Sequence, residues 1–114
     1  MKDTEKRKYA RIESTNLLNF VCLDEKGEPS QQGMGRTLNV SEAGILLETY
    51  HPIEPQTHIS LTIGMEEDLV ELDGTVVFLR ERIDDTFEAG IQFSKINDHE
   101  QRILSKFIKA FEEK

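Results

Sequence analysis

The hydrophobic residues of this chain change their spacing once, late in the sequence, from a period of two to the period of a helix. Before that point, Ile59, Leu61 and Ile63 alternate with polar residues in segment 58–63, and residues 87–93 alternate in the same way. Alternation of this kind is typical of strands that bury one face. The pattern therefore predicts a set of strands followed by a helix.

Asn97 and Glu100 mark the predicted start of that helix. Their three-residue spacing is a capping box, with Asn97 as the N-cap and Glu100 as the third helical residue. The apolar residues that follow fall on one helical face: Ile103, Leu104, Phe107, Ile108 and Phe111. We expect a helix over about 97–112 that covers an open end or side of the β-structure.

Four further segments are apolar and β-prone, and turn residues separate them: 17–23, 33–39, 45–49 and 69–80. Gly74, inside the last of these segments, is a plausible bulge. With 58–63 and 87–93, the chain has about six short strands at close spacing. The predicted class is all-β, a closed antiparallel barrel or a sandwich with one C-terminal helix. A length of 114 residues suits a single domain.

The composition excludes several classes of protein. Apolar runs are at most four residues long, whereas a membrane-spanning helix needs about 20. The N-terminal residues MKDTEKRKYAR lack the apolar stretch of a secretory signal. Cys22 is the single cysteine and lies in an apolar segment, so we expect it in the core. These features predict a cytoplasmic protein without membrane insertion.

The formal net charge of -8 makes general binding of DNA or RNA unfavourable, because phosphate attraction dominates such binding. The charge is uneven: residues 1–11 carry five basic and two acidic side chains, a net +3, which leaves -11 for the rest. A basic arm on an acidic body is a candidate anion site, although charge alone also fits a solvated, frayed terminus. The predicted division is a basic arm, residues 1–13, and a folded domain, residues 14–114.

Side chains typical of catalytic or metal sites form no recognisable pattern in the sequence. The three histidines, His51, His58 and His99, are scattered and lack a cysteine or acidic partner at metal-ligand spacing. Neither a Gly-x-Ser-x-Gly elbow nor a P-loop is present. We therefore predict no catalytic residue, no metal site and no cofactor, and a binding protein rather than an enzyme.

Arg7 and Arg11 form an Arg-x-x-x-Arg pattern ahead of the first predicted strand. Guanidinium groups are planar and permanently charged, and they hold a phosphate or the O6/N7 edge of guanine with paired hydrogen bonds. On an extended arm, residues four apart point the same way at a separation of roughly 13 Å. The pair can therefore span an extended anionic ligand.

Asn39, Ser41 and Gly44 form an Asn-x-Ser-x-x-Gly pattern between two predicted strands. Asn and Ser side chains can hydrogen-bond a base edge or a phosphate. Gly44 permits a positive φ or a close backbone approach. The same residue types are usual in an ordinary β-turn, so this pattern alone leaves both interpretations open.

Together, the two patterns resemble those of the PilZ domain family, small six-stranded β-barrels that bind the bacterial second messenger cyclic di-GMP. The resemblance covers nearly the whole chain, including the strand order, the Gly-Ile-Gln-Phe ending of the last strand at 90–93 and the C-terminal helix. In the family, the arginine arm is mobile when empty and closes over the nucleotide against the barrel. The resemblance implies ligand contacts from the residues of both patterns: Arg7, Arg11, Asn39, Ser41 and Gly44.

Four further residues are secondary candidates for ligand contacts: Lys6, Lys8, Arg36 and Phe78. In the family, a bulky cation at the position of Lys6 accompanies binding of a stacked pair of nucleotides. Arg36 either contacts a phosphate or lines an exposed strand. Phe78 lies near where relatives often place an aromatic or basic residue under a guanine, but its parity with Val76 favours a core position.

The resemblance implies a non-enzymatic receptor whose ligand changes its contact with a partner protein. Outputs typical of the family are motility, pilus function, biofilm and exopolysaccharide control, and virulence. The alternative is a PilZ-like adaptor that binds protein and has lost its affinity for the nucleotide. Such members usually lack one or both patterns, and this chain keeps both.

Overall fold

The computed structural model describes residues 17–65 and 67–113, so residues 1–16, Glu66 and Lys114 lie outside the description. The predicted basic arm, with Lys6, Arg7, Lys8 and Arg11, falls outside it. The described elements are six strands and one helix: β1 (Leu17–Leu23), β2 (Pro29–Val40), β3 (Gly44–Thr49), β4 (His58–Met65), β5 (Asp68–Glu81), β6 (Phe87–Phe93) and α2 (Asp98–Glu112).

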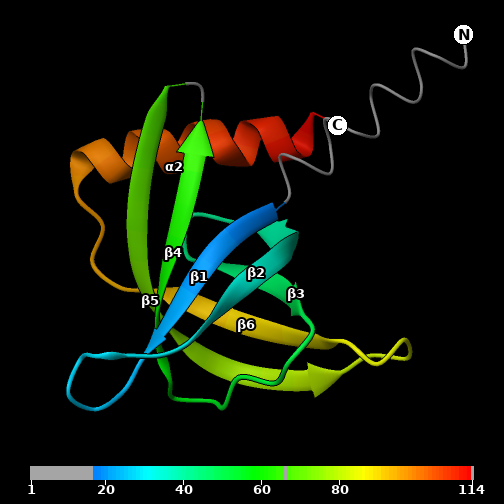
Figure 1. Cartoon of the computed structure of the whole chain (residues 1–114). Helices are drawn as coiled ribbons and strands as arrows, with labels where there is room; N and C mark the ends of the chain where they lie inside the picture. The colour runs from blue at the N-terminus through cyan, green and yellow to red at the C-terminus, as the bar shows by residue number, and fades with distance from the viewer. Residues whose placement is uncertain (1–16, 66, 114) are drawn as a thin grey trace, which may run out of the picture.

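The six strands form a closed barrel in the order β1-β2-β3-β6-β5-β4, and all neighbouring pairs are antiparallel (Figure 1). Closure is made by β1 and β4, which pair from Asn19 with Thr62 to Leu23 with His58. A barrel of this kind pairs its edge strands and so leaves no open sheet edge. The predicted all-β class is confirmed, and the closed barrel is the correct one of the two predicted architectures.

Alternating side chains of the strands fill the barrel. In β1, Leu18, Phe20 and Cys22 are buried, and their neighbours along the strand are exposed or half-buried. In β4, Ile59, Leu61 and Ile63 are at most 1% exposed, as their period of two predicts. Burial raises the pKa of the Cys22 thiol, because a thiolate loses solvation in an apolar interior. Cys22 is therefore the core residue that the sequence predicted.

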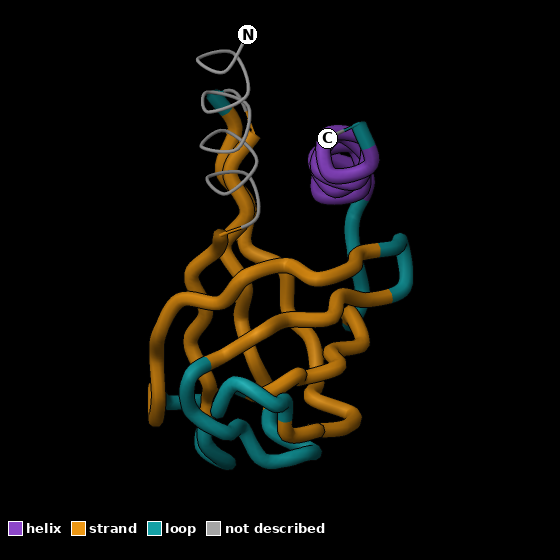
Figure 2. Tube along the Cα trace, turned by 90° about the vertical axis from the view of Figure 1, so that its right-hand side faces the viewer, coloured by secondary structure: helices purple, strands orange, loops and turns teal. Residues whose placement is uncertain are grey.

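Helix α2 packs on the barrel beside β4 and β5 (Figures 1 and 2). Its apolar face buries Ile103, Leu104 and Phe107, while Ile108 and Phe111 pack partly buried against the same core. Within the described part of the chain, no helix has the length and apolar character needed to cross a bilayer.

The predicted capping box begins α2. The Asn97 side chain accepts a hydrogen bond from the Glu100 backbone N–H at 2.8 Å, and the Glu100 carboxylate accepts one from the Asn97 N–H at 3.1 Å. Two N–H groups at the helix start are satisfied in this way.

Replacement of Asn97 by alanine is expected to destabilise the domain by about 1 kcal/mol, since it removes the N-cap acceptor. Chemical denaturation measures the change, and His99→Ala, an exposed first-turn substitution outside the box, should leave stability nearly unchanged. A loss of stability as large in His99→Ala would contradict a specific role of the cap.

Register shifts interrupt the barrel ladders at three places in the described part of the chain, and none is at Gly74, where the sequence predicted a bulge. Gly74 pairs in register with Ile59 and Phe93, and a Cβ atom there would lie 2.7 Å from the Gln92 carbonyl oxygen. Glycine is required at this position because β6 approaches closely, so the prediction of a bulge at Gly74 is wrong. The register shifts instead lie between Val76 and Phe78 in β5, between Thr37 and Asn39 in β2, and between Cys22 and Leu23 where β1 meets β2. The first two adjoin the site described below.

Candidate functional site

The turn between β2 and β3 is organised by Ser41. Its Oγ atom accepts hydrogen bonds from the backbone N–H groups of Ala43, at 3.2 Å, and Gly44, at 3.3 Å. The backbone N–H of Ser41 also donates to the Gly44 carbonyl oxygen at 2.9 Å. The hydroxyl therefore fixes the shape of the turn, and it can still donate its own hydrogen to a ligand.

Gly44 begins β3 directly beside β6. A Cβ atom at Gly44 would overlap the Ile91 carbonyl oxygen, which is a backbone atom that a rotamer change cannot move. The Ala43 carbonyl oxygen accepts a hydrogen bond from the Phe93 N–H at 2.9 Å, which ties the turn to β6. Of the two roles predicted for Gly44, close backbone approach is the one observed, since its φ is not positive.

Asn39 is directed outward by the bulge in β2. Thr37 pairs with Leu47 and Asn39 with Leu46, so Leu38 is the extra residue of this strand. Thr37 and Val40 are buried while Asn39 is exposed, which breaks the alternation between them. Bulges redirect side chains in this way at the rims of barrels. Asn39 Oδ1 accepts the Val40 N–H at 2.9 Å and keeps a second lone pair for a ligand.

The bulge in β5 directs Phe78 outward. Val70, Leu72 and Val76 follow the predicted inward parity, but Val77 and Phe78 are both exposed on the outer face. Because the register shift lies between Val76 and Phe78, the inward and outward alternation that starts at Val70 no longer holds after Val76. The prediction of a core position for Phe78 is therefore wrong, and its ring lies on the outer face of the barrel.

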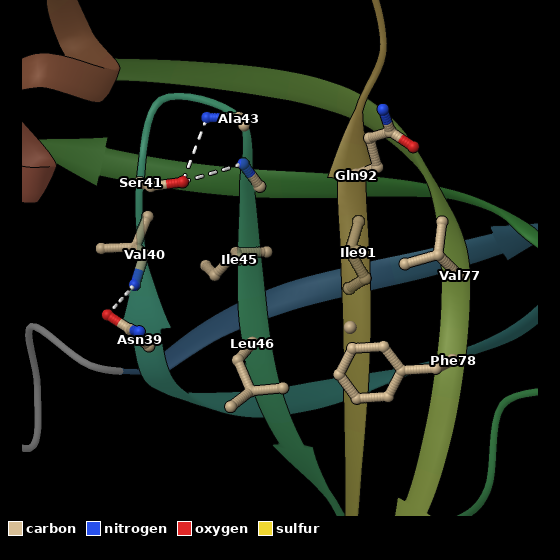
Figure 3. A pocket seen from close by; sticks show the side chains of 12 residues that line it. Asn39, Val40, Ser41, Ala43, Ile45, Leu46, Val77, Phe78, Ile91 and Gln92 are labelled. Atoms are coloured by element: carbon tan, nitrogen blue, oxygen red, sulfur yellow. Dashed lines mark hydrogen bonds between the residues drawn. The ribbon is translucent and has the colours of Figure 1, made fainter.

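The Phe78 ring lies across β6 at Gly90 (Figure 3). A Cβ atom at Gly90 would overlap Cε2 of the ring, so only glycine leaves room for this ring position. The bulges bring Asn39, Leu46, Gly90 and Phe78 into one row of cross-strand partners over four strands. This row crosses the outer face of the barrel next to the turn.

A hollow of about 460 Å³ opens on the outer face at this row (Figure 3). Its lining residues are Asn39, Val40, Ser41, Ala43, Gly44, Ile45, Leu46, Val77, Phe78, Gly90, Ile91 and Gln92. Among the described residues, those that line the hollow are all uncharged. The hollow therefore offers an aromatic ring, aliphatic side chains and the amide and hydroxyl groups of Asn39, Ser41 and Gln92. Such a surface suits a planar heterocycle with a polar edge.

A row of charged residues adjoins the hollow on the side away from the β2–β3 turn. Arg36, Glu48, Glu88 and Arg80 are successive cross-strand partners on β2, β3, β6 and β5. Arg36 Nε is paired with Glu48 Oε1 at 2.8 Å and is not part of the hollow lining. Arg36 thus lines an exposed strand and pairs across it, which is the second of its two predicted roles.

The hairpin between β5 and β6 adds Arg82 and Thr86 to this charged row. Arg82 Nη1 donates to Glu88 Oε2 at 2.9 Å, and Arg82 Nε lies 3.4 Å from Glu48 Oε2. The Thr86 hydroxyl lies 2.7 Å from Asp84 Oδ1 and lowers the pKa of that carboxyl. These contacts join the hairpin to β3, and they engage Arg82 with two carboxylates.

The structure brings together Asn39, Ser41 and Gly44 as the sequence predicted, and it adds Phe78 to them. Lys6, Arg7, Lys8 and Arg11 lie outside the described residues. The sequence motifs do not mark Leu46, Gly90, Gln92 and Arg80, because the placement of these residues depends on strand pairing and on the bulges in β2 and β5. Across residues 17–65 and 67–113, no three His, Cys, Asp or Glu side chains are grouped so that they could hold a metal ion.

The described chain is thus a closed six-stranded barrel with one helix and a hollow at the β2–β3 turn. The profile of the PilZ domain family matches residues 5–110, and the chain therefore belongs to this family. No curated protein matches the chain in sequence.

Three solved structures show the same fold. The PilZ domain of YcgR from Escherichia coli, solved with c-di-GMP, has a TM-score of 0.63 at 14% identity and covers 85% of this chain and 82% of its own. The PilZ domain of CeSA, from a cellulose-synthesizing bacterium, has a TM-score of 0.59 at 12% identity, with 84% and 93% covered. The K. pneumonia MrkH–c-di-GMP complex has a TM-score of 0.60 at 17% identity, with 87% of this chain but 50% of that chain covered.

Proposed function

We propose that this protein is a receptor for cyclic di-GMP that binds the nucleotide in the hollow beside the β2–β3 turn. The observation that carries the proposal is the position of Asn39, Ser41 and Gly44 on the rim of a hollow that Phe78 closes on the opposite side. Two of the similar solved structures, those of YcgR and MrkH, contain c-di-GMP. The family and the hollow support the same ligand.

In this proposal, the hollow binds a guanine of the ligand and the arm binds its phosphates. A guanine lies against Phe78 and Leu46, where stacking and apolar contact favour a flat ring. Asn39 and Ser41 hydrogen-bond its edge, as amide and hydroxyl groups can. Since the hollow lining is uncharged, the two phosphates take their main counter-charges from Arg7 and Arg11.

The length of the arm is sufficient for this role. Leu17, the first residue of β1, pairs with Arg36, and Arg36 precedes Asn39 by only three residues on β2. Arg11 precedes Leu17 by six residues and Arg7 precedes it by ten. A fully extended chain of these lengths spans at most roughly 20 Å and 33 Å, respectively. Both guanidinium groups are therefore within reach of the hollow.

We further propose that ligand binding orders the arm against residues 14–114 and so changes the surface offered to a cytoplasmic effector protein. A ligand shifts such an equilibrium only by its difference in affinity for the two states. Motility, biofilm or pilus functions are the corresponding outputs. No catalytic role is proposed: among the described residues that line the hollow, none is a nucleophile paired with a base. The alternative is a protein-binding adaptor with weak or no affinity for the nucleotide.

Isothermal titration calorimetry of the wild-type chain with cyclic di-GMP tests the proposal, with GMP as the control ligand. Cyclic di-GMP should bind and GMP should bind at least about a hundredfold more weakly, since it engages one base only. We expect two nucleotides per chain, from the cation Lys6 ahead of Arg7. A stoichiometry of one would exclude the stacked pair, and no binding of cyclic di-GMP would favour the adaptor alternative.

Replacement of Phe78 by alanine is expected to lower the affinity for cyclic di-GMP about tenfold, which corresponds to one lost base–aromatic stack. Gly90→Ala should have a similar effect although the ring is retained, because the new Cβ displaces it. Leu69→Ala is the matched control, since Leu69 is an apolar side chain that is 72% exposed and outside the hollow. Equal affinities of Phe78→Ala and wild type would rule out the stack.

A further inference from the structure

Arg80 differs from the other two arginines of the charged row in how little of it is engaged. Arg36 is bound to Glu48 at 2.8 Å, and Arg82 to Glu88 at 2.9 Å. Arg80 Nε lies 3.7 Å from Glu88 Oε1, which is beyond hydrogen-bond distance. The Arg80 side chain is also 65% exposed, against 44% for Arg36 and 30% for Arg82. Arg80 therefore keeps most of its donors available to a ligand.

The position of Arg80 is set by the same bulge that directs Phe78 outward. Without the register shift after Val76, parity would direct Arg80 into the barrel. With it, Arg80 follows Phe78 on the outer face, and its Cζ lies over the Phe78 ring at 5.0 Å from the ring centroid. A cation over an aromatic face is held by the ring quadrupole. The guanidinium keeps N–H donors at its edge when its face is occupied.

The positive charge of Arg80 can balance ligand charge that the hollow lining does not balance. The described residues that line the hollow are uncharged, while the ligand proposed for it carries two phosphates. The body of the chain, residues 12–114, has a formal charge of -11 and repels such an anion. Phe78 lies on the side of the hollow away from Asn39 and the turn (Figure 3), and Arg80 places a positive charge over its ring.

We infer that Arg80 is a fixed phosphate-binding residue at the Phe78 rim of the hollow, and that it holds an anionic cyclic dinucleotide from the side opposite the β2–β3 turn. The inference rests on the proposed function and adds to it a cation that belongs to the barrel rather than to the arm. Phe78 positions Arg80, and Arg80 neutralises one phosphate.

The test is calorimetric titration of cyclic di-GMP into wild type, Arg80→Ala and Arg80→Lys, each at low and high NaCl concentration. Arg102→Ala, which removes an exposed arginine on α2, is the charge-matched control. Arg80→Ala should weaken binding roughly fivefold to tenfold, because an exposed charge pair contributes less than a buried one. Its affinity should also depend less on salt than that of wild type. Arg80→Lys should recover part of the loss, and Arg102→Ala should bind as wild type does.

Three results would overturn the inference. Binding by Arg80→Ala equal to wild type would show that Arg80 makes no contact, while the proposed function would stand. A loss of affinity with an unchanged salt dependence, or one not relieved by Arg80→Lys, would exclude the phosphate contact. No binding of cyclic di-GMP by wild type would remove the proposed function and the inference with it. Thermal melts of the variants should match wild type within a few degrees, which separates lost contact from lost fold.

Discussion

Replacement of Arg7 and Arg11 together by alanine is expected to weaken cyclic di-GMP binding more than a hundredfold. Each guanidinium contributes charge-assisted hydrogen bonds to the ligand, and such bonds contribute about 1.5–3 kcal/mol each. Loss of both therefore corresponds to at least about 3 kcal/mol, or two orders of magnitude in affinity. The measurement is calorimetric titration of the double variant beside wild type.

The control for this prediction is the double variant Lys26→Ala/Lys95→Ala. This control also removes two positive charges, but from exposed positions outside the hollow. A small loss of affinity there measures the general effect of net charge, which salt should screen. If Arg7→Ala/Arg11→Ala binds no more weakly than this control, the assignment of the arm to the ligand is wrong even though the chain remains a receptor.

Replacement of Gly44 by alanine is expected to destabilise the domain by at least about 2 kcal/mol and to abolish measurable ligand binding. The new Cβ overlaps the Ile91 carbonyl oxygen, so β3 and β6 must separate at the turn. Separation would also weaken the bond between the Phe93 N–H and the Ala43 carbonyl. Thermal denaturation should show a decrease in melting temperature of roughly 10 °C.

Gly64→Ala is the matched control for Gly44→Ala. The nearest atom to its new Cβ is Leu69 Cδ1 at 3.3 Å, the end of an exposed side chain that can rotate away. It should therefore keep both stability and ligand affinity near those of wild type. A Gly44→Ala variant as stable as Gly64→Ala would contradict the close approach of β3 and β6.

The fold could be predicted from the sequence because its main signals are local. The period of two in Ile59, Leu61 and Ile63 persists as a buried face of β4, and Asn97 and Glu100 form the cap that their spacing predicts. The closed barrel was one of two architectures that local signals leave open, since closure depends on the distant pairing of β1 with β4.

The site could be predicted only where a motif marks it. Asn39, Ser41 and Gly44 fall within six consecutive residues of the sequence, and they lie together on the rim of the hollow. For Phe78, the alternation of β5 favours a core position only if it continues unbroken through Val77, where the strand in fact contains a bulge. A bulge depends on pairing with a second strand, so the sequence of β5 alone does not reveal it.

Arg80 was overlooked for the same physical reason. If the alternation of β5 continued through the bulge, the Arg80 side chain would point toward the barrel interior. Arg80 also belongs to neither sequence motif. Gly74 shows the converse error, since a glycine inside a strand indicates a bulge or a close approach, and here it is the approach of β6. Both corrections depend on contacts between strands that are adjacent in the barrel.

The central claim is that cyclic di-GMP binds in the hollow between the β2–β3 turn and Phe78. The most direct test is a titration of the ¹⁵N-labelled wild-type chain with cyclic di-GMP, followed by amide chemical shifts in NMR spectra. The account predicts that the largest shifts of the barrel fall on Ser41, Gly44, Phe78 and Gly90, with small shifts along β1 and β4. Absence of shifts at saturating nucleotide, or shifts concentrated on β1 and β4, would contradict it.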